Sequence, residues 1–403
     1  MDNGTPLEHI RATTLKLLAY CKASGWAGYD PYDALNSRLF EALPFLNSRI
    51  PRLCLTQALK RSPVNVRPLA LVPKTQNPKA LALFLSSVLK IEDWAPTGRA
   101  DVAHELTDRL IALKSPGSRY WCWGYSFPWQ TRTAIVPRWS ANVVCTSFVA
   151  NALLDAYERR GESRAVIMAS SAARYVRDEL YWRRGAETGL RYPLPDSPCR
   201  IHNANLLGAA LLTRVYKTTG DTRLVDPALD VARYSCARQH DDGSWPYAEE
   251  PGQHWIDNFH TGYNLCALAS IGRLLCTAEF QPAVRRGLEF YREHFFREDG
   301  APRYFHDRTF PIDIHCVAQS IITLAVLQAF HPDNMRLAHA VLRWAFANMW
   351  NERGYFYYRV HRFGTIRTSY MRWSQAWMLL AMSTLLDECT AKVQQPLRTR
   401  ALA

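Results

Sequence analysis

The sequence has little that would indicate a membrane span, a metal site or a disulfide scaffold. It contains no window of about 18 uninterrupted apolar residues, so we expect no membrane-spanning helix. The ten cysteines include no CxxC pair, which leaves no standard zinc or redox motif. Cys145 and Cys316 lie in apolar segments, where a free thiol behaves as a small hydrophobic side chain. The sequence therefore predicts free thiols, no metal site and no cofactor.

The chain also lacks a dense basic tract, although its net charge is strongly positive. Lys and Arg number 49 against 36 Asp and Glu, which gives +13, but these residues are scattered. Without a recognisable nucleic-acid module, this balance favours an acidic glycan or a membrane surface over nucleic acid as partner. Residues 1–4 are polar and no apolar run follows them. We therefore expect no signal peptide and a cytoplasmic protein, with peripheral association with membrane polysaccharide machinery as one option.

What the sequence does contain is a recurrence. Four short polar segments each precede an apolar, helix-like run, and they occupy residues 202–205, 257–263, 313–316 and 370–373. His202 and His260 are 58 residues apart, His315 follows after 55 more, and Tyr370 after another 55. An even spacing of this size is typical of stacked helical hairpins. The polar residues would then converge on one mouth of the assembly.

The hydrophobic pattern predicts an all-α fold, an (α/α)6 toroid with short β-turns on its rim. Apolar inner helices are expected at residues 146–159, 205–217, 262–276, 317–330 and 373–386. Amphipathic outer helices are expected at residues 164–180, 224–239, 282–296 and 335–349. No linker interrupts the chain, so residues 1–403 are predicted to form a single domain. Within it, residues 1–100 are expected to be less regular, and residues 394–403 to form a frayed tail.

Several segments carry a resemblance to a known family. GYDPYD (residues 28–33), NPKAL (77–81), CWGYSFPWQ (122–130) and DNFHTGY (257–263) resemble bacterial polysaccharide-biosynthesis proteins of the VpsJ-like type. The resemblance covers most of the chain and implies an (α/α)6 toroid with a role in exopolysaccharide or capsule biosynthesis. QHDDGSW (239–245) is similar to a turn of terpenoid cyclases and prenyltransferase β chains, which share the toroid. The DxDD-type acid motif and the zinc spacing of those proteins are missing, so this second likeness concerns the fold alone.

The residues of the recurrence suit chemistry on a uronic acid. The predicted catalytic residues are His260, Tyr263, His202, His315 and Arg372. Removing the proton beside a carboxylate requires a neutralised carboxylate and a nearby base such as His or Tyr. β-Elimination and C5-epimerisation both begin in this way. Three histidines acting as metal ligands would have to approach within about 3–4 Å, which separate points on a wide ring do not favour.

Aromatic and neutral polar residues near the expected mouth are candidates for substrate binding. They are Trp121, Trp123, Tyr125, Trp129, Gln130, Asn203, Asn205, Trp245, Asp257, Asn258, Gln319, Tyr370 and Trp373. Flat aromatic faces match the apolar face of a sugar ring, although several of these rings would serve equally well to fill the toroid. Asp30, Asp33, Asp242, Asp257 and Asp313 are candidates for a glycosidase pair. Asp257 and Asp313 are also natural N-cap residues.

Taken together, these patterns predict a carbohydrate-active enzyme that acts on an acidic polysaccharide or oligosaccharide. Its chemistry would be that of a lyase, a C5-epimerase or a hydrolase. Two alternatives stay open: a non-catalytic glycan-binding or assembly component, and a toroid that binds an isoprenoid or lipid. A deep pocket lined by the catalytic candidates favours the enzyme, whereas an open tryptophan-lined groove favours the binding component.

Overall fold

The computed structural model describes residues 6–43, 48–92, 94–95, 100–130 and 135–400. Six inner helices form a ring: α4 (Pro78–Ile91), α6 (Val143–Arg160), α8 (His202–Thr219), α10 (Asn258–Leu274), α12 (Ile314–Val326) and α14 (Trp377–Arg400). Each contacts the next in this order, and α14 contacts α4, which closes the ring. The toroid predicted from the recurrence is therefore confirmed.

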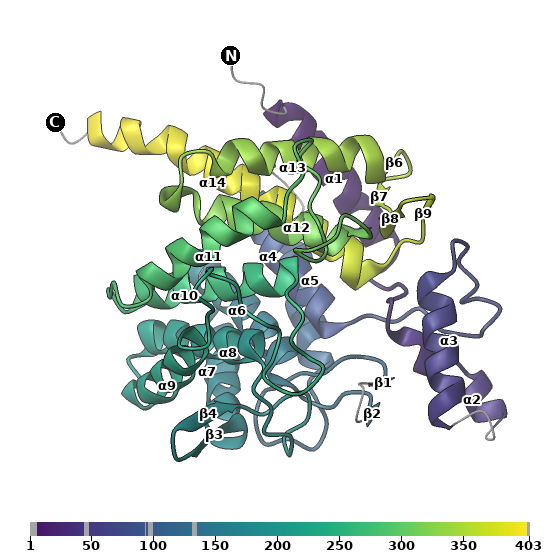
Figure 1. Cartoon of the computed structure of the whole chain (residues 1–403), viewed down its shortest axis with the longest axis horizontal. Coiled ribbons are helices and arrows are strands. Elements are labelled where there is room, and N and C mark those ends of the chain that lie inside the picture. Colours follow the sequence, from purple (N-terminus) through teal and green to yellow (C-terminus); the bar gives the residue numbers. More distant parts are fainter. Residues whose placement is uncertain (1–5, 44–47, 93, 96–99, 131–134, 401–403) are drawn as a thin grey trace.

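Outer helices surround this ring (Figure 1). They are α1 (Leu7–Ala23), α5 (Ala100–Ala112), α7 (Ser163–Tyr175), α9 (Val225–Cys236), α11 (Gln281–His294) and α13 (Asn334–Met349). Helices α5 to α13 each contact the inner helix that precedes them in the chain, whereas α1 contacts α14. The sixth hairpin thus joins both ends of the chain. The N-terminal part, which we expected to be less regular, supplies one outer and one inner helix.

Several inner helices begin at a residue whose side chain caps the helix. The side chains of Asn77, Asp257 and Asp313 accept hydrogen bonds from the first turns of α4, α10 and α12. Such a cap satisfies a backbone N–H that has no partner within the helix. The prediction that Asp257 and Asp313 act as N-caps is confirmed. Helix α6 ends at Gly161, whose φ of 71° lies in the left-handed region that glycine adopts without a steric penalty.

Short strands and helical turns occupy the loops of the ring. The strands are β1 (Trp129–Gln130), β2 (Ile135–Val136), β3 (Tyr181–Arg184), β4 (Glu187–Leu190), β5 (Ile312–Asp313), β6 (Trp350–Asn351), β7 (Tyr355–Phe356), β8 (Arg359–His361) and β9 (Gly364–Ile366). They pair antiparallel as β1–β2, β3–β4, β5–β8–β9 and β6–β7. The turns are η1 (Asp33–Asn36), η3 (Val176–Leu180), η4 (Thr222–Leu224), η5 (Gln328–Phe330) and η6 (Met371–Ala376).

Two further helices, α2 (Leu39–Ala42) and α3 (Arg49–Arg61), lie to one side of the ring (Figure 1). Their segment has a small core of its own, formed by Ala34, Leu59, Ala70 and Val72. The main core belongs to the ring and its outer helices. No helix in the described part of the chain is both long and apolar enough to cross a membrane. Helix α14 continues to Arg400, and residues 401–403 of the segment predicted to fray lie outside the described residues.

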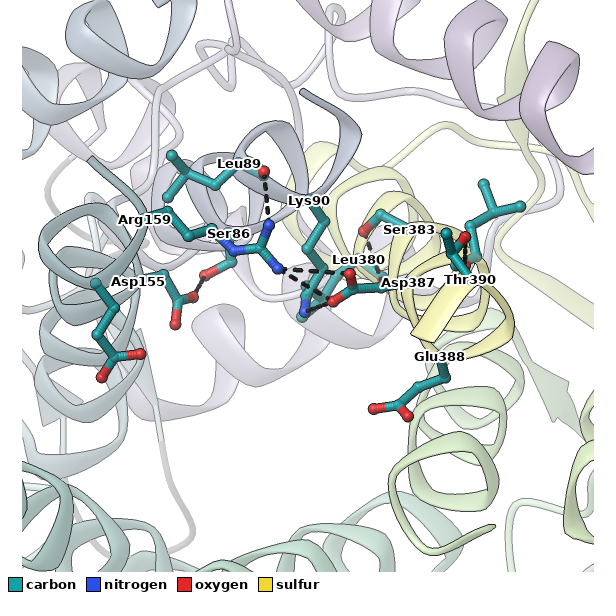
Figure 2. A network of polar contacts seen from close by, with 12 residues as sticks. Ser86, Leu89, Lys90, Asp155, Arg159, Leu380, Ser383, Asp387, Glu388 and Thr390 are labelled. Carbon is teal, nitrogen blue, oxygen red and sulfur yellow. Dashed lines mark hydrogen bonds and ion pairs between the residues drawn. The ribbon is translucent and has the colours of Figure 1, made fainter. Parts of the chain in front are cut away.

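A polar network links three of the inner helices (Figure 2). Lys90 of α4 and Arg159 of α6 both pair with Asp387 of α14, at 2.8 and 3.3 Å. The Ser86 hydroxyl donates to Asp155 at 2.6 Å, which joins α4 to α6 a second time. Lys90 and Arg159 lie near the C-terminal ends of their helices. These contacts stabilise the closure between the two ends of the chain and leave the N-terminal turns of the inner helices available for function.

Candidate active site

A cavity of about 870 Å³ lies where the N-terminal turns of the inner helices meet. Five inner helices and η6, the turn before the sixth, contribute to its wall. The contributing side chains are Lys79 of α4, Val144 of α6, Asn203 of α8, His260 and Tyr263 of α10, His315 of α12, and Arg372 and Trp373 of η6, directly before α14. Convergence follows from the ring itself, because helices that point the same way present the same end to one mouth.

His260 and Asp257 form a dyad on the cavity wall. His260 Nδ1 lies 2.7 Å from Asp257 Oδ2, and Oδ1 of the same carboxylate accepts the His260 backbone N–H at 3.0 Å. The indole of Trp255 donates to Oδ2 at 2.9 Å. A carboxylate that accepts from Nδ1 fixes the imidazole tautomer, so Nε2 carries the lone pair of the neutral ring. His260 is therefore oriented to take up or give back a proton in the cavity.

Tyr263 and His315 form a second pair, which is buried. The Tyr263 hydroxyl and His315 Nε2 are 2.6 Å apart. Burial raises the pKa of Tyr263 well above its ordinary value, and burial with neighbouring cations lowers the pKa of His315 well below its own. The tyrosine hydroxyl thus donates to a neutral imidazole. That ring stacks between Phe259 and Trp377, each at a centroid distance of 4.6 Å.

Arg372 is held in place by a carboxylate from the other end of the chain. Its Nε and Nη2 donate to Asp30 at 2.7 and 2.8 Å, and both side chains are buried. Asp33, three residues on, pairs with the buried Arg67 at 2.8 Å. Burial raises the pKa of Asp33 to about 6, against the opposing effect of Arg67. The candidate carboxylates Asp30 and Asp33 therefore serve as arginine partners that position this side of the cavity.

An aromatic wall completes the cavity. Tyr247 stacks on Trp255 at a centroid distance of 4.5 Å and an interplanar angle of 12°. On another side, Trp129 packs against Tyr192 at 6.5 Å. Tyr304 also lines the space. Such rings offer apolar faces and polar edges, which is the combination that sugar rings need.

The structure brings ten of the predicted site residues to this cavity. They are His260, Tyr263, His315, Arg372, Tyr125, Trp129, Gln130, Asn203, Asp257 and Trp373. It does not bring eight others to the cavity wall, namely His202, Trp121, Trp123, Asn205, Trp245, Asn258, Gln319 and Tyr370. For each of these eight, the local packing gives a physical reason.

His202 turns away because of its position in the helix. It is the first residue of α8 and is fully buried, with Nδ1 3.3 Å from the Ser235 hydroxyl of α9. Consecutive helical residues point about 100° apart, so the next residue, Asn203, faces the cavity instead. His260 and His315 stand at the third and second positions of their helices. The recurrence predicted the helix starts but not this difference in phase.

Three tryptophans are structural. The indole N–H of Trp123 donates to the Leu110 carbonyl at 2.8 Å, and that of Trp245 donates to the Ser235 carbonyl at 2.9 Å. Both side chains are fully buried. Trp121 packs against Trp123 with centroids 6.1 Å apart. These rings fill the toroid, which was the alternative interpretation of the tryptophan-rich loops.

The remaining four polar candidates have partners elsewhere in the fold. The Asn205 amide bonds the Leu190 backbone and the Ser235 hydroxyl, at 2.8 and 3.1 Å, and thereby joins α8 to β4 and α9. Asn258 bonds the hydroxyls of Tyr291 and Ser320, Gln319 donates to Thr323, and Tyr370 packs under the guanidinium of Arg67. Asp242, a carboxylate candidate, accepts the Ser244 backbone N–H within a turn.

Several lining residues were not among the predicted site residues. The most notable is Lys79, whose side chain is 3% exposed and faces the cavity from the first turn of α4. Asn77 and Pro78 directly before it form a typical helix start, so it stands where His260 and His315 stand in their own helices. Tyr192, Tyr247, Tyr304 and Lys60 lie in loops or in α3 and reach the cavity only through tertiary structure.

The fold can be compared with solved structures. A cellobiose 2-epimerase from Spirochaeta thermophila matches 79% of this chain and 87% of its own, with a TM-score of 0.60 and 13% identity. A GH76 α-mannanase from Bacteroides thetaiotaomicron matches 79% of this chain and 88% of its own, with a TM-score of 0.61 and 11% identity. An unsaturated glucuronyl hydrolase specific for heparin matches 96% of this chain and 98% of its own, with a TM-score of 0.61 and 11% identity.

At such identities the likeness shows the fold alone. The chain therefore has the (α/α)6 toroid that these three solved structures share. No known protein family matches its sequence, and no curated protein does. The resemblance to VpsJ-like polysaccharide-biosynthesis proteins stays a prediction.

Proposed function

We propose that this protein is a carbohydrate-active enzyme that transfers a proton at a carbon of a sugar acid, as an epimerase or a lyase does. The carrying observation is the His260–Asp257 dyad, whose Nδ1···Oδ2 distance is 2.7 Å. It leaves Nε2 of a cavity-lining imidazole to exchange the proton. The Tyr263–His315 pair would serve as the second proton-transfer group, since its hydroxyl is protonated and its imidazole neutral.

Hydrolysis is supported less well by the same cavity. Glycosidases generally use two carboxyl groups, one of them as a general acid. Among the described lining residues, the carboxylates are Asp257 and Asp307. Asp257 already accepts three hydrogen bonds, and both oxygens of Asp307 accept from Arg308. Asp313 bonds Arg359 and the Trp373 indole. These engagements favour proton transfer through histidine.

The names of the structural neighbours agree with sugar chemistry in this fold. They include an epimerase, a mannanase and a glucuronyl hydrolase. An acidic substrate is supported by the basic side chains of the wall, where Lys79 and Lys60 accompany Arg372 and Arg308. Arg372 and Arg308 pair with carboxylates, whereas Lys60 bonds the Tyr32 hydroxyl at 3.0 Å. If the protein acts in exopolysaccharide or capsule biosynthesis, the sugar acid that it acts on would be a unit of a cell-surface polysaccharide.

Solvent exchange tests this proposal. The protein is incubated in D₂O with uronic-acid oligosaccharides, and products are analysed by mass spectrometry and ultraviolet absorbance. We expect deuterium in the sugar for an epimerase, or an unsaturated product for a lyase. His260→Ala should slow either reaction about 10²- to 10⁴-fold. His104→Ala, in an exposed pair with Asp108 on α5, is the matched control and should keep full activity.

Two results would contradict the proposal. The first is unchanged turnover in His260→Ala. The second is glycan binding by the wild-type protein with neither exchange nor product, which would identify the non-catalytic binding component instead. Binding of an isoprenoid in place of every glycan would indicate the third class, a toroid for lipids.

We also propose that the protein associates with an anionic membrane surface through the segment that carries α2 and α3. Six of the eleven exposed large apolar side chains of the described residues lie there: Leu43, Ile50, Leu53, Val64, Leu69 and Leu71. Residues 34–76 contain seven Lys and Arg against one carboxylate, Glu41. Exposed apolar groups with surrounding cations are the combination that anionic lipid surfaces attract. Leu53 and Lys60 also line the cavity, so this surface continues to its mouth.

Vesicle co-sedimentation tests the membrane surface. We expect binding to phosphatidylglycerol vesicles and little to phosphatidylcholine. The double substitution Ile50→Ser with Leu69→Ser should weaken it, because both side chains are more than 70% exposed. Phe363→Ser removes a side chain elsewhere that is 92% exposed, and it is the control. Equal binding to both lipids, or equal loss in the control, would contradict this assignment.

A further inference from the structure

The amine of Lys79 lies in an aromatic enclosure. Its Nζ lies 4.1 Å from the ring centroid of Phe148, 5.1 Å from that of Trp377 and 5.5 Å from that of Tyr263. In the described part of the chain, no carboxylate lies within ion-pair distance of this amine, and the side chain borders the cavity. Buried lysines are normally paired. This amine instead faces the space that the substrate would occupy.

The groups around the amine supply no free negative charge. Arg372 of η6 faces it, and the Asp30 carboxylate is already bound by that arginine. The thiol of Cys145, on α6, is neutral because burial raises its pKa to about 12. The side chains of Tyr263 on α10 and His315 on α12 are neutral as well. Helix α14 contributes the Trp377 ring.

The electrostatic consequence is an amine whose charged form is disfavoured. Burial, reinforced by Arg372, lowers the pKa of Lys79 well below its ordinary value. The aromatic faces favour an ammonium, but a cation–π contact contributes only about 0.5–2 kcal/mol. Removing an unpaired charge from water costs more than that. The amine is therefore poised to become charged when a partner of opposite sign enters.

We propose that Lys79 is the anion-binding site of the cavity, where it binds a sugar carboxylate and takes up one proton as it does so. The balance is simple: the amine gains a proton from solution, and the resulting ammonium pairs with the incoming carboxylate. No bond of the sugar changes in this step. The inference rests on the proposed function only in that a sugar acid enters the cavity, and it assigns the residue that selects the acid.

The position of Lys79 gives this site a role in the chemistry. The amine lies over the ring of Tyr263, whose hydroxyl bonds His315. A carboxylate bound there is brought next to this proton-transfer pair. Neutralising the carboxylate makes the carbon beside it more acidic, because negative charge that develops on deprotonation is stabilised. Lys79 is then a binding residue for the acid and an electrostatic aid to proton removal.

Calorimetry tests the proposal with two matched disaccharides. Cellobiouronic acid carries the carboxylate, and cellobiose is its neutral counterpart. Titrations near pH 7.5 in two buffers of different ionisation enthalpy report the protons taken up. We expect about one proton for the acid and none for the neutral sugar with the wild-type protein. Lys79→Met, an apolar side chain of similar length, should weaken acid binding about 10- to 100-fold and leave cellobiose unaffected.

A second variant separates charge from proton uptake. Lys79→Arg keeps a permanent cation, since guanidinium does not deprotonate in proteins. Lys79→Arg should bind the acid without proton uptake. His260→Ala should keep both the affinity for the acid and the proton uptake, even when turnover is lost. Circular dichroism verifies that each variant is folded.

Three results would overturn the inference: wild-type binding of the acid without proton uptake, unchanged affinity of folded Lys79→Met, or no binding of the acid at all. Loss of turnover alone in Lys79→Met would not support it. Failure of His260→Ala to lose activity would contradict the proposed function but not the anion site.

Discussion

Two arginine–aspartate pairs in this protein have nearly the same geometry and very different burial. In the Arg372–Asp30 pair, the donors lie 2.7 and 2.8 Å from the carboxylate, and the side chains are 5% and 4% exposed. In the Arg223–Asp221 pair, the distances are 2.8 and 2.9 Å, and the exposures 69% and 23%. Each carboxylate also accepts a backbone N–H from two residues further on. They form a matched comparison of what burial does to an ion pair.

Asp30→Asn should cost far more stability than Asp221→Asn. At an effective dielectric of about 20, two unit charges about 4 Å apart interact with roughly 4 kcal/mol. Removing one partner of a buried pair also leaves a charge without compensation, and the measured cost is about 3–5 kcal/mol. The exposed pair is screened by water, so its loss should change stability very little. We therefore expect a difference of about 3 kcal/mol between the two variants.

Urea unfolding followed by tryptophan fluorescence measures both free energies. The double variant Asp30→Leu with Arg372→Met removes both charges and should recover much of what Asp30→Leu alone loses. Losses that agree within 1 kcal/mol for Asp30→Asn and Asp221→Asn would refute the reasoning. So would a double variant that is less stable than the single one, because the cost would then not come from an unpaired charge.

Two further predictions concern pH and packing. Burial lowers the pKa of His202 to about 4. Between pH 4 and 6.5 the imidazole is therefore protonated in the unfolded chain but not in the folded one. This difference contributes about 3 kcal/mol of stability above pH 6.5, which is lost as the pH falls toward 4. His202→Gln should flatten the pH dependence of urea unfolding, whereas the exposed His104→Gln should not. A Cβ at Gly124 would clash with the Ser140 carbonyl, but one at Gly364 meets open space. Gly124→Ala should lower the free energy of unfolding by about 2 kcal/mol or more, and Gly364→Ala by less than about 0.5 kcal/mol. Equal losses in the two variants would contradict this packing.

The helices of the ring could be predicted because their signals are local. Apolar periodicity marked the inner helices, and Asp257 and Asp313 marked two of their starts. Each of these features involves residues within a turn or two of one another. The earlier part of the chain was harder to predict, because α1 is separated from its partner α14 by nearly the whole sequence. No local pattern announces that the two ends of a chain complete one hairpin.

The cavity could be predicted in outline only. The recurrence indicated that helix starts would meet, and His260, Tyr263 and His315 do line one cavity. Whether a residue faces that cavity depends on its phase in the helix, which changes by about 100° per position. His202 and Asn203 exchange roles for this reason. A one-residue difference of this kind cannot be read from spacing near 55 residues.

The sequence by itself determined the inner helices from residue 146 onward, two of their caps and the ring, because apolar periodicity and capping act over a few residues. Tertiary structure alone decided which charged groups have an ion-pair partner and which face the cavity without one. Asp30 reaches Arg372 across 342 positions of the chain, and that contact occupies the carboxylate that would otherwise be free near Lys79. Because electrostatic partners are set by distance in space and by burial, the character of Lys79 emerges only when the ring has closed.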